Sequence, residues 1–328
     1  RMPRGSRRAE IALLLVSVAA ALLVAEAAAR LLAGPTSSGY APLKTGRRER
    51  APINALGYRD LDRAQPRPAG VRRVLCLGDS FTWGVGVMWD DAWPQRVERL
   101  VSRTRGERWE AVSLAEPGMN AVQQASRLES EGWGYGPDVV VFGYVLNDSE
   151  DENAAEARRA RDWAEEEQEK KTAAPDLASR SALFSLVRSR VHATVENRRR
   201  VTGYRSMYAD DYAGWLGARR ALAAMGGMCR ARGVPFVVAI FPLFANPLDD
   251  GYPFRELHAK VAQAAGESGA KVLDLLPYYR TVDWRLLVVD GAADEHPNEI
   301  AHRIAAQAIA RAIDEVVPRA PAQAPARP

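Results

Sequence analysis

Apolar stretches alternate with helical patterns between residues 74 and 316, and this alternation constrains the fold more than any other feature of the chain. Five apolar stretches have the length and composition of buried strands, at residues 74–77, 111–114, 139–146, 235–241 and 272–275. Apolar residues recur every three to four positions over residues 90–101, 121–131, 212–232, 254–265 and 299–316, as in helices. Strands that alternate with helices form parallel sheets covered on both faces. We therefore expect one α/β domain.

The composition is typical of a globular protein and argues against several classes of partner. Of the 328 residues, 47% are hydrophobic and eight are Trp, which is ample for a packed core. The net charge is only +4, so we expect no nucleic-acid partner. No CxxC or HExxH sequence occurs, and we expect neither a metal nor a cofactor. Cys76 and Cys229 are expected to be buried free thiols.

The first 33 residues have the character of a membrane anchor. Residues 11–29 are apolar apart from Ser17 and Glu26, which is close to the roughly 20 residues needed to cross a bilayer. Glu26 falls in the last turn of this expected helix, where it can pair with Arg30. The arginines that precede the apolar stretch predict a cytoplasmic N-terminus. The part of the chain after this segment would then lie in the periplasm or at the cell surface.

A cleaved signal peptide is the alternative interpretation of the same segment. Residues 25–27 and 27–29 both have the small-x-small form that a signal peptidase prefers. Cleavage there would give a secreted protein in place of an anchored one.

Three further segments flank or interrupt the expected domain of residues 71–317. Residues 34–70 are rich in Gly, Pro and Arg and are expected to form a linker. Residues 148–205 contain no strand pattern and begin with many charged residues, which predicts a helical insertion. It is either a solvated surface excursion or a roof over the site. Residues 318–328, PRAPAQAPARP, are expected to form a disordered tail.

Ser80 follows the first expected strand in a Gly-Asp-Ser turn. Open α/β sheets bind ligands at the carboxyl ends of their strands, so this position suits a functional hydroxyl. A serine becomes a good nucleophile when an imidazole takes its proton and a carboxylate holds that imidazole. Gly-Asp-Ser is also a common turn tripeptide, and by itself it does not decide between the two interpretations.

Two hydrogen-bond donors follow the next two strands at the same expected edge. Gly118 lies in a turn ahead of a helix, and its backbone N–H could face an oxyanion. Asn147 follows the third strand and could donate from its side-chain amide. Each of these positions, taken alone, also fits an ordinary turn.

His296 is the histidine best placed for catalysis. The other three, His192, His258 and His302, lie in helical or insertion segments. His296 lies in a short loop rich in Asp and Pro before the last helix, where its imidazole can reach the edge that holds Ser80.

The order of these motifs resembles the SGNH (GDSL-like) hydrolase family over about residues 72–317. The motifs are Gly-Asp-Ser, then Gly, then Gly-x-x-x-Asn-Asp, then Asp-x-His-Pro-Asn. Trp93-Pro94 and Pro137-Asp138 look like the corresponding sequence of membrane-tethered bacterial members. The resemblance implies a three-layer α/β/α sandwich with a flavodoxin-like, five-stranded parallel sheet.

The same resemblance implies roles for individual residues. Ser80 would be the nucleophile and His296 the general base. The oxyanion hole would consist of the backbone N–H groups of Ser80 and Gly118 and the side chain of Asn147.

The acid of the triad departs from the family pattern. Members usually carry it three residues before the histidine, where this chain has Ala293. The available carboxylates are Asp294, two residues before His296, and Asp290, six residues before it. We take Asp294 as the acid because Asp-x-His-Pro-Asn looks like a variant of tethered members, and Asp290 stays as the alternative.

These observations lead us to expect a serine ester hydrolase that works through an acyl-enzyme. An extracytoplasmic position and the family analogy favour O-acyl esters of bacterial envelope or exported carbohydrate as substrates. Three alternatives stay open: an O-acyltransferase acting on polysaccharide, a lysophospholipase or thioesterase, and a catalytically silent glycan-binding module of the same fold.

Overall fold

The computed structural model describes residues 4–32, 51–151, 181, 183–184, 198–290 and 294–319. The chain divides into two units, residues 1–41 with 158–202 and residues 42–157 with 203–328. Most of the expected tail and of the expected insertion lie outside the described residues, as does His192.

In the first unit, helix α1 spans Arg4–Leu32. Its segment Ala9–Arg30 has a mean hydropathy of 2.5 and is long and apolar enough to cross a membrane. The predicted pair in its last turns is confirmed, because Arg30 Nε lies 2.8 Å from Glu26 Oε1. Glu26 Oε2 also accepts from Ser181 Oγ at 2.8 Å and from the backbone N–H of Leu183 at 2.9 Å. The carboxylate is therefore fully engaged at the end of the apolar segment.

The second unit is built on a five-stranded parallel sheet in the order β2-β1-β3-β4-β5. The strands are β1 (Val71–Gly78), β2 (Arg108–Ser113), β3 (Val139–Tyr144), β4 (Phe236–Ile240) and β5 (Lys271–Asp274). This is the flavodoxin-like order, with a topological switch point between β1 and β3. All five predicted strands and the predicted fold class are confirmed.

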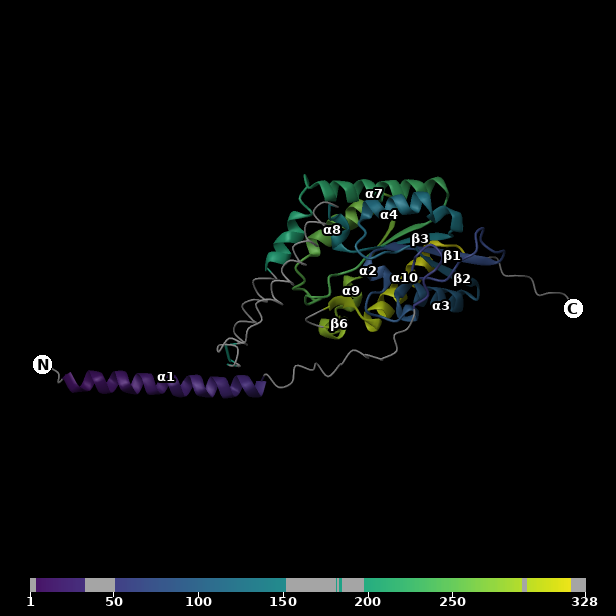
Figure 1. Ribbon diagram of the computed structural model, residues 1–328. Coiled ribbons are helices and arrows are strands. Elements are labelled where there is room, and N and C mark those ends of the chain that lie inside the picture. Colours follow the sequence, from purple (N-terminus) through teal and green to yellow (C-terminus); the bar gives the residue numbers. More distant parts are fainter. Residues whose placement is uncertain are drawn as a thin grey trace. The chain divides into compact units, whose positions relative to one another are not determined.

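Helices cover both faces of the sheet (Figure 1). On one face lie α3 (Trp93–Arg105) and α10 (Glu299–Val316), and on the other lie α4 (Ala121–Ser130), α7 (Ala213–Ala231) and α8 (Arg255–Glu267). The shorter elements are α2 (Ser80–Trp83), α9 (Leu276–Tyr279), η1 (Trp89–Asp91), η2 (Gly132–Tyr135), η3 (Leu146–Ser149) and η5 (Trp284–Leu286). The arrangement is the expected three-layer sandwich.

The three central strands form the core. Every residue of β3 and β4 is buried, and Val74 to Leu77 of β1 are fully enclosed. Long runs of Val, Leu, Ile and Phe suit strands that are covered on both faces. Cys76 in β1 and Cys229 in α7 are buried and free, as predicted.

Side chains occupy the outward-facing N–H groups of the edge strand β2. Alternate residues of an edge strand point their N–H groups away from the sheet, where another strand could pair with them. In β2 three such groups donate to side-chain oxygens: Trp109 to Ser102 Oγ at 3.1 Å, Ala111 to Glu98 Oε2 at 2.8 Å, and Ser113 to Asp60 Oδ2 at 2.9 Å. This edge offers no free row of donors.

Residues 51–70, which the sequence analysis assigned to the linker, pack against the α/β unit. Tyr58 is buried and donates from its hydroxyl to Glu131 Oε2 at 2.7 Å. Asp60 is buried against β2, and Arg63 donates to Glu98 Oε2 at 2.9 Å. The Gly, Pro and Arg content suggested a linker, but these side chains have partners on α3, on β2 and at the C-terminal end of α4, far away in the sequence.

A two-stranded antiparallel ribbon stands where a loop was expected around His296. Strand β6 (Val288–Asp290) pairs with β7 (Asp294–Pro297), and β7 leads directly into α10. Asp and Pro suggested a loop because both are common in turns. Pro297 is tolerated because it ends its strand, where no ladder N–H is required.

Candidate active site

Ser80 begins helix α2 immediately after β1, at the sheet edge where β1 and β3 end side by side. Asp79 caps this short helix, and its Oδ1 accepts from the backbone N–H of Phe81 at 3.0 Å. Ser80 Oγ lies 3.5 Å from Asp79 Oδ2, which is long for a hydroxyl hydrogen bond. The serine is partly exposed, and its hydroxyl is held only weakly.

Two glycines allow α2 to sit this close to the sheet. Gly78 ends β1 with φ at 149°, and a Cβ there would lie 2.1 Å from Thr82 Oγ1. Gly143 pairs with it on β3, and a Cβ there would lie 2.6 Å from the same oxygen. Larger residues at either position would push α2, and Ser80 with it, away from the sheet.

Gly118 lies in a loop that is fastened to the end of β1. The backbone N–H of Glu116 donates to Gly78 O at 3.3 Å, and Met119 N closes the turn onto Glu116 O at 3.3 Å. Gly118 has φ at 81°, as the third residue of a type II turn requires. Within the part of the chain that the structure describes, neither the N–H of Gly118 nor that of Ser80 has a hydrogen-bond partner.

Asn147 lies in η3, just past the end of β3. Its Nδ2 donates to Asp79 Oδ2 at 2.9 Å, so Asp79 joins Ser80 and Asn147. An amide nitrogen has two hydrogens, and this bond uses one of them. A second link joins the loops, because Asn120 Nδ2 donates to Glu150 O at 3.2 Å. The structure thus brings together the ends of β1, β2 and β3.

His296 lies on β7, and its ring packs against Phe81, the residue after Ser80. The ring centroids are 5.6 Å apart, and the two planes meet at 59°. Phe81 in turn packs against Phe241 and Phe244, each at 6.0 Å, at the carboxyl end of β4. His296 therefore reaches the predicted edge of the sheet, on the ribbon in place of the expected loop. Like Ser80, it is partly exposed.

Asn298 fastens the ribbon that carries His296. Its Nδ2 donates to Leu286 O at 2.9 Å and Val288 O at 3.2 Å, and its Oδ1 accepts from the backbone N–H groups of Ile300 and Ala301. One side chain thus caps α10 and holds the start of β6. The sequence signal for this role was the Asn that follows His-Pro, directly before a helical pattern.

The predicted acid can be placed only by its backbone. Asp294 begins β7 and pairs with Asp290 at the end of β6, so both candidate residues lie on the same ribbon. Their side chains lie outside the described part of the chain. The choice between Asp294 and Asp290 stays a prediction.

Burial shapes the electrostatics beneath the site. Burial raises the pKa of the Asp79 carboxyl, and the bond from Asn147 partly opposes this rise. Burial raises the pKa of Asp148 much further, and the nearby charge of Asp79 adds to the effect. Of these two carboxyls, Asp148 has its pKa raised the more, while Asp79 accepts hydrogen bonds from Asn147 and from the N–H of Phe81.

The two described histidines in helices are structural. His258 Nδ1 lies 2.9 Å from Asp274 Oδ1, and its Nε2 lies 3.3 Å from the Tyr252 hydroxyl. His302 is fully buried, and its Nδ1 accepts from the backbone N–H of Trp93 at 3.2 Å. Neither ring is exposed to a substrate, as the sequence analysis expected for histidines on helices.

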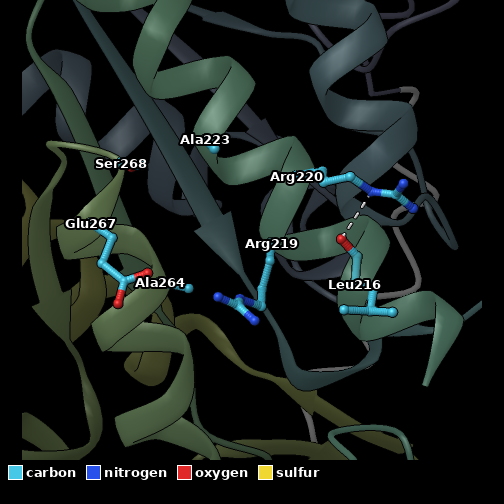
Figure 2. Close-up of a pocket in the computed structure, with 7 residues that line it drawn as sticks. All are labelled: Leu216, Arg219, Arg220, Ala223, Ala264, Glu267 and Ser268. Carbon is cyan, nitrogen blue, oxygen red and sulfur yellow. Dashed lines mark hydrogen bonds between the residues drawn. The ribbon is translucent and has the colours of Figure 1, made fainter. Parts of the chain in front are cut away.

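A separate cavity of about 400 Å³ lies between α7 and α8, on the helical layer that covers one face of the sheet (Figure 2). Figure 2 shows Arg219 reaching from α7 toward Ala264 of α8, with Glu267 beside it. Arg220 Nε instead folds back to Leu216 O at 3.2 Å. None of the residues that line this cavity is among the predicted site residues.

Comparisons with known proteins agree with the fold. The sequence model of the GDSL-like Lipase/Acylhydrolase family matches residues 76–304, more than two thirds of the chain. No curated protein matches the chain.

The solved structures that the chain is similar to include several esterases. The structure described as TesA is 13% identical and covers 75% of this chain and 99% of its own, with a TM-score of 0.46. A two-domain esterase active on acetylated mannans is 12% identical and covers 79% and 52%, with a TM-score of 0.43. An acetyl xylan esterase is 15% identical and covers 74% and 99%, with a TM-score of 0.44.

Proposed function

The chain belongs to the GDSL-like lipase/acylhydrolase family and hydrolyses ester bonds, and on this premise we propose that it works through an acyl-enzyme on Ser80. One observation carries the proposal. Asp79 Oδ2 is shared by Ser80 Oγ and Asn147 Nδ2, which brings a hydroxyl and an amide donor together at the switch point of the sheet.

In the proposed mechanism Ser80 Oγ attacks the ester carbonyl while His296 takes the hydroxyl proton. The carbonyl oxygen becomes an oxyanion, which accepts from the N–H of Ser80, the N–H of Gly118 and the free hydrogen of Asn147. His296 then protonates the departing alcohol, which leaves an acyl group on Ser80. Water attacks that group, His296 takes its proton, and the acid departs as Ser80 recovers its hydrogen. Asp294 orients the imidazole throughout.

The proposed substrates are O-acyl esters of envelope or exported carbohydrate. The apolar helix supports a location at a membrane, with the arginines before it on the cytoplasmic side. Gly118 is exposed and Ser80 and His296 are partly exposed, so the site is open enough for a bulky alcohol such as a sugar chain.

The first test is hydrolysis of p-nitrophenyl acetate by the full chain and by Ser80→Ala, with Ser130→Ala as the matched control. Ser130 is exposed on α4 and donates only to Ser126 O within its own helix. We expect Ser80→Ala to lose at least about 1,000-fold in kcat and Ser130→Ala to keep wild-type rates. Equal rates for Ser80→Ala and the wild type would refute the nucleophile.

The substrate class is tested with acetylated polysaccharides by following the release of acetate. Release by the wild type and not by Ser80→Ala supports a carbohydrate esterase. Transfer of the acetyl group to an added sugar, without free acetate, would instead show an acyltransferase that uses the same serine.

A further inference from the structure

Arg59 binds the turn that directly follows the helix of Ser80, through hydrogen bonds to backbone carbonyls. Its Nη1 donates to Trp83 O at 2.9 Å and to Gly84 O at 2.8 Å, and its Nη2 donates to Val87 O at 2.7 Å. One guanidinium thus binds three carbonyl groups within five consecutive residues. Such charge-assisted bonds are stronger than bonds between neutral groups.

The turn that Arg59 binds is hydrogen-bonded directly to Ser80. The backbone N–H groups of Gly84 and Val85 donate to Ser80 O at 3.0 and 3.1 Å. Helix α2 has only four residues, so its last carbonyls lack partners within the helix. Arg59 supplies a partner for the carbonyl of Trp83, the last residue of α2, and for that of the cap residue Gly84, and its charge is favourable at the C-terminal end of a helix.

The same turn contacts the ribbon that carries His296. Gly86 has φ at 81°, and a Cβ there would lie 2.5 Å from Val289 Cγ2 on β6. The turn therefore touches Ser80 through its hydrogen bonds and the β6–β7 ribbon through packing. A shift of this turn would change the position of the serine relative to the imidazole.

We propose that Arg59 is a positioning residue for Ser80: it fixes residues 83–87 and so sets the nucleophile against His296. The proposal rests on the proposed role of Ser80. Arg59 lies outside the matched family region of residues 76–304, in the stretch that separates the apolar helix from β1. This stretch then positions Ser80 through Arg59, besides packing against the α/β unit.

The test compares Arg59→Ala and Arg59→Lys with Arg67→Ala in the full chain. Arg67 comes from the same stretch of chain but pairs with Asp138. That residue directly precedes β3, at the amino ends of the strands and so at the opposite end of the sheet from Ser80. The measurements are kcat and KM for p-nitrophenyl acetate, the rate at which a fluorophosphonate labels Ser80, and the midpoint of thermal unfolding.

We expect Arg59→Ala to lower kcat and the labelling rate together by about 10- to 100-fold while KM changes less than about threefold, because misplacement of a reacting group slows chemistry more than binding. Arg59→Lys should recover part of both rates, since an ammonium can bind some of the three carbonyls. Arg67→Ala should keep both rates.

Folded Arg59→Ala with wild-type kcat and labelling would overturn the proposal. If that variant does not fold, Arg59→Lys decides, and wild-type rates in Arg59→Lys would overturn it too. Activity that survives in Ser80→Ala would instead refute the proposed function, because that substitution removes the proposed nucleophile. The two failures can therefore be told apart.

Discussion

Asn147 Nδ2 and Asp79 Oδ2 lie 2.9 Å apart, so the amide at the end of β3 is hydrogen-bonded to the residue that precedes Ser80 at the end of β1. Asp79 Oδ1 also accepts a hydrogen bond from the N–H of Phe81, and Asp79 Oδ2 lies 3.5 Å from Ser80 Oγ. The position of the amide thus depends on a buried carboxylate that does not itself face the substrate. This dependence can be measured.

We expect Asp79→Asn to fold and to lose about 10- to 100-fold in kcat. The variant can keep the acceptor for Phe81, but an amide nitrogen in place of Oδ2 cannot accept from Asn147. Asn147→Ala should cost about 100- to 1,000-fold, as the loss of one oxyanion donor commonly does. If Asp79 acts through Asn147, adding Asp79→Asn to Asn147→Ala will change kcat little. Fully additive losses would contradict this route.

Asn298 should matter for both stability and rate. Asn298→Ala removes the cap of α10, at a cost of about 1 to 2 kcal/mol in the free energy of unfolding, and leaves the carbonyls of Leu286 and Val288 without that donor. Asn298→Ser keeps an acceptor for the cap and loses both hydrogen bonds to Leu286 O and Val288 O, without placing a charge there. Denaturant unfolding and kcat together separate the roles. We expect Asn298→Ser to be more stable than Asn298→Ala, with a kcat still well below that of the wild type. Wild-type kcat in Asn298→Ser would show that the ribbon does not need these bonds.

His302 makes the fold sensitive to acid. Burial, with help from the charges of Arg96 and Arg59, lowers the pKa of this imidazole from 6.5 to about 3. Between those two values the unfolded chain binds a proton that the folded chain does not, so the free energy of unfolding falls as the pH drops below about 6.5. The loss from this one residue should reach about 2 to 3 kcal/mol at pH 4.5.

The measurement for His302 is denaturant unfolding at several pH values between 7.5 and 4.5. His302→Asn keeps an acceptor for Trp93 N but has no proton to bind, so its stability should depend less steeply on pH over this range. The variant starts from a lower stability at pH 7.5 because the smaller side chain leaves a cavity. Parallel pH curves for the two proteins would exclude His302 as the source.

Gly143 and Gly227 form a matched pair of glycines. A Cβ at Gly143 would lie 2.6 Å from Thr82 Oγ1, whereas a Cβ at Gly227, inside α7, would meet nothing within 4 Å. Gly143→Ala should displace α2 and lower kcat at least tenfold, because Ser80 moves with that helix. Gly227→Ala should raise the free energy of unfolding by about 0.5 to 1 kcal/mol at unchanged kcat. Full activity in Gly143→Ala would mean that α2 can move without harm.

Local patterns in the sequence predicted the sheet and its covering helices. The buried strands are runs of apolar residues, and in the helices between them apolar residues recur every three to four positions. They also predicted that Ser80, Gly118 and Asn147 lie at one edge, since parallel strands end together, and that His296 reaches this edge from the segment before the last helix. They did not predict Arg59 or Asp60, whose partners lie far along the chain. Nothing local distinguishes an arginine that binds three carbonyls from one in a solvated linker. The β6–β7 ribbon was missed because its two strands are short and hold Asp and Pro.

The side chains that close β2 also affect how this protein behaves in concentrated solution. A chain shortened to begin at Val71 would keep every strand that the structure describes and the whole matched family region, yet it would lose Asp60 and leave the N–H of Ser113 open. An open β edge recruits strands from other molecules. We expect such a shortened protein to form β-rich aggregates on storage, whereas a protein that begins at residue 51, and so also lacks the apolar helix, stays monodisperse under the same conditions.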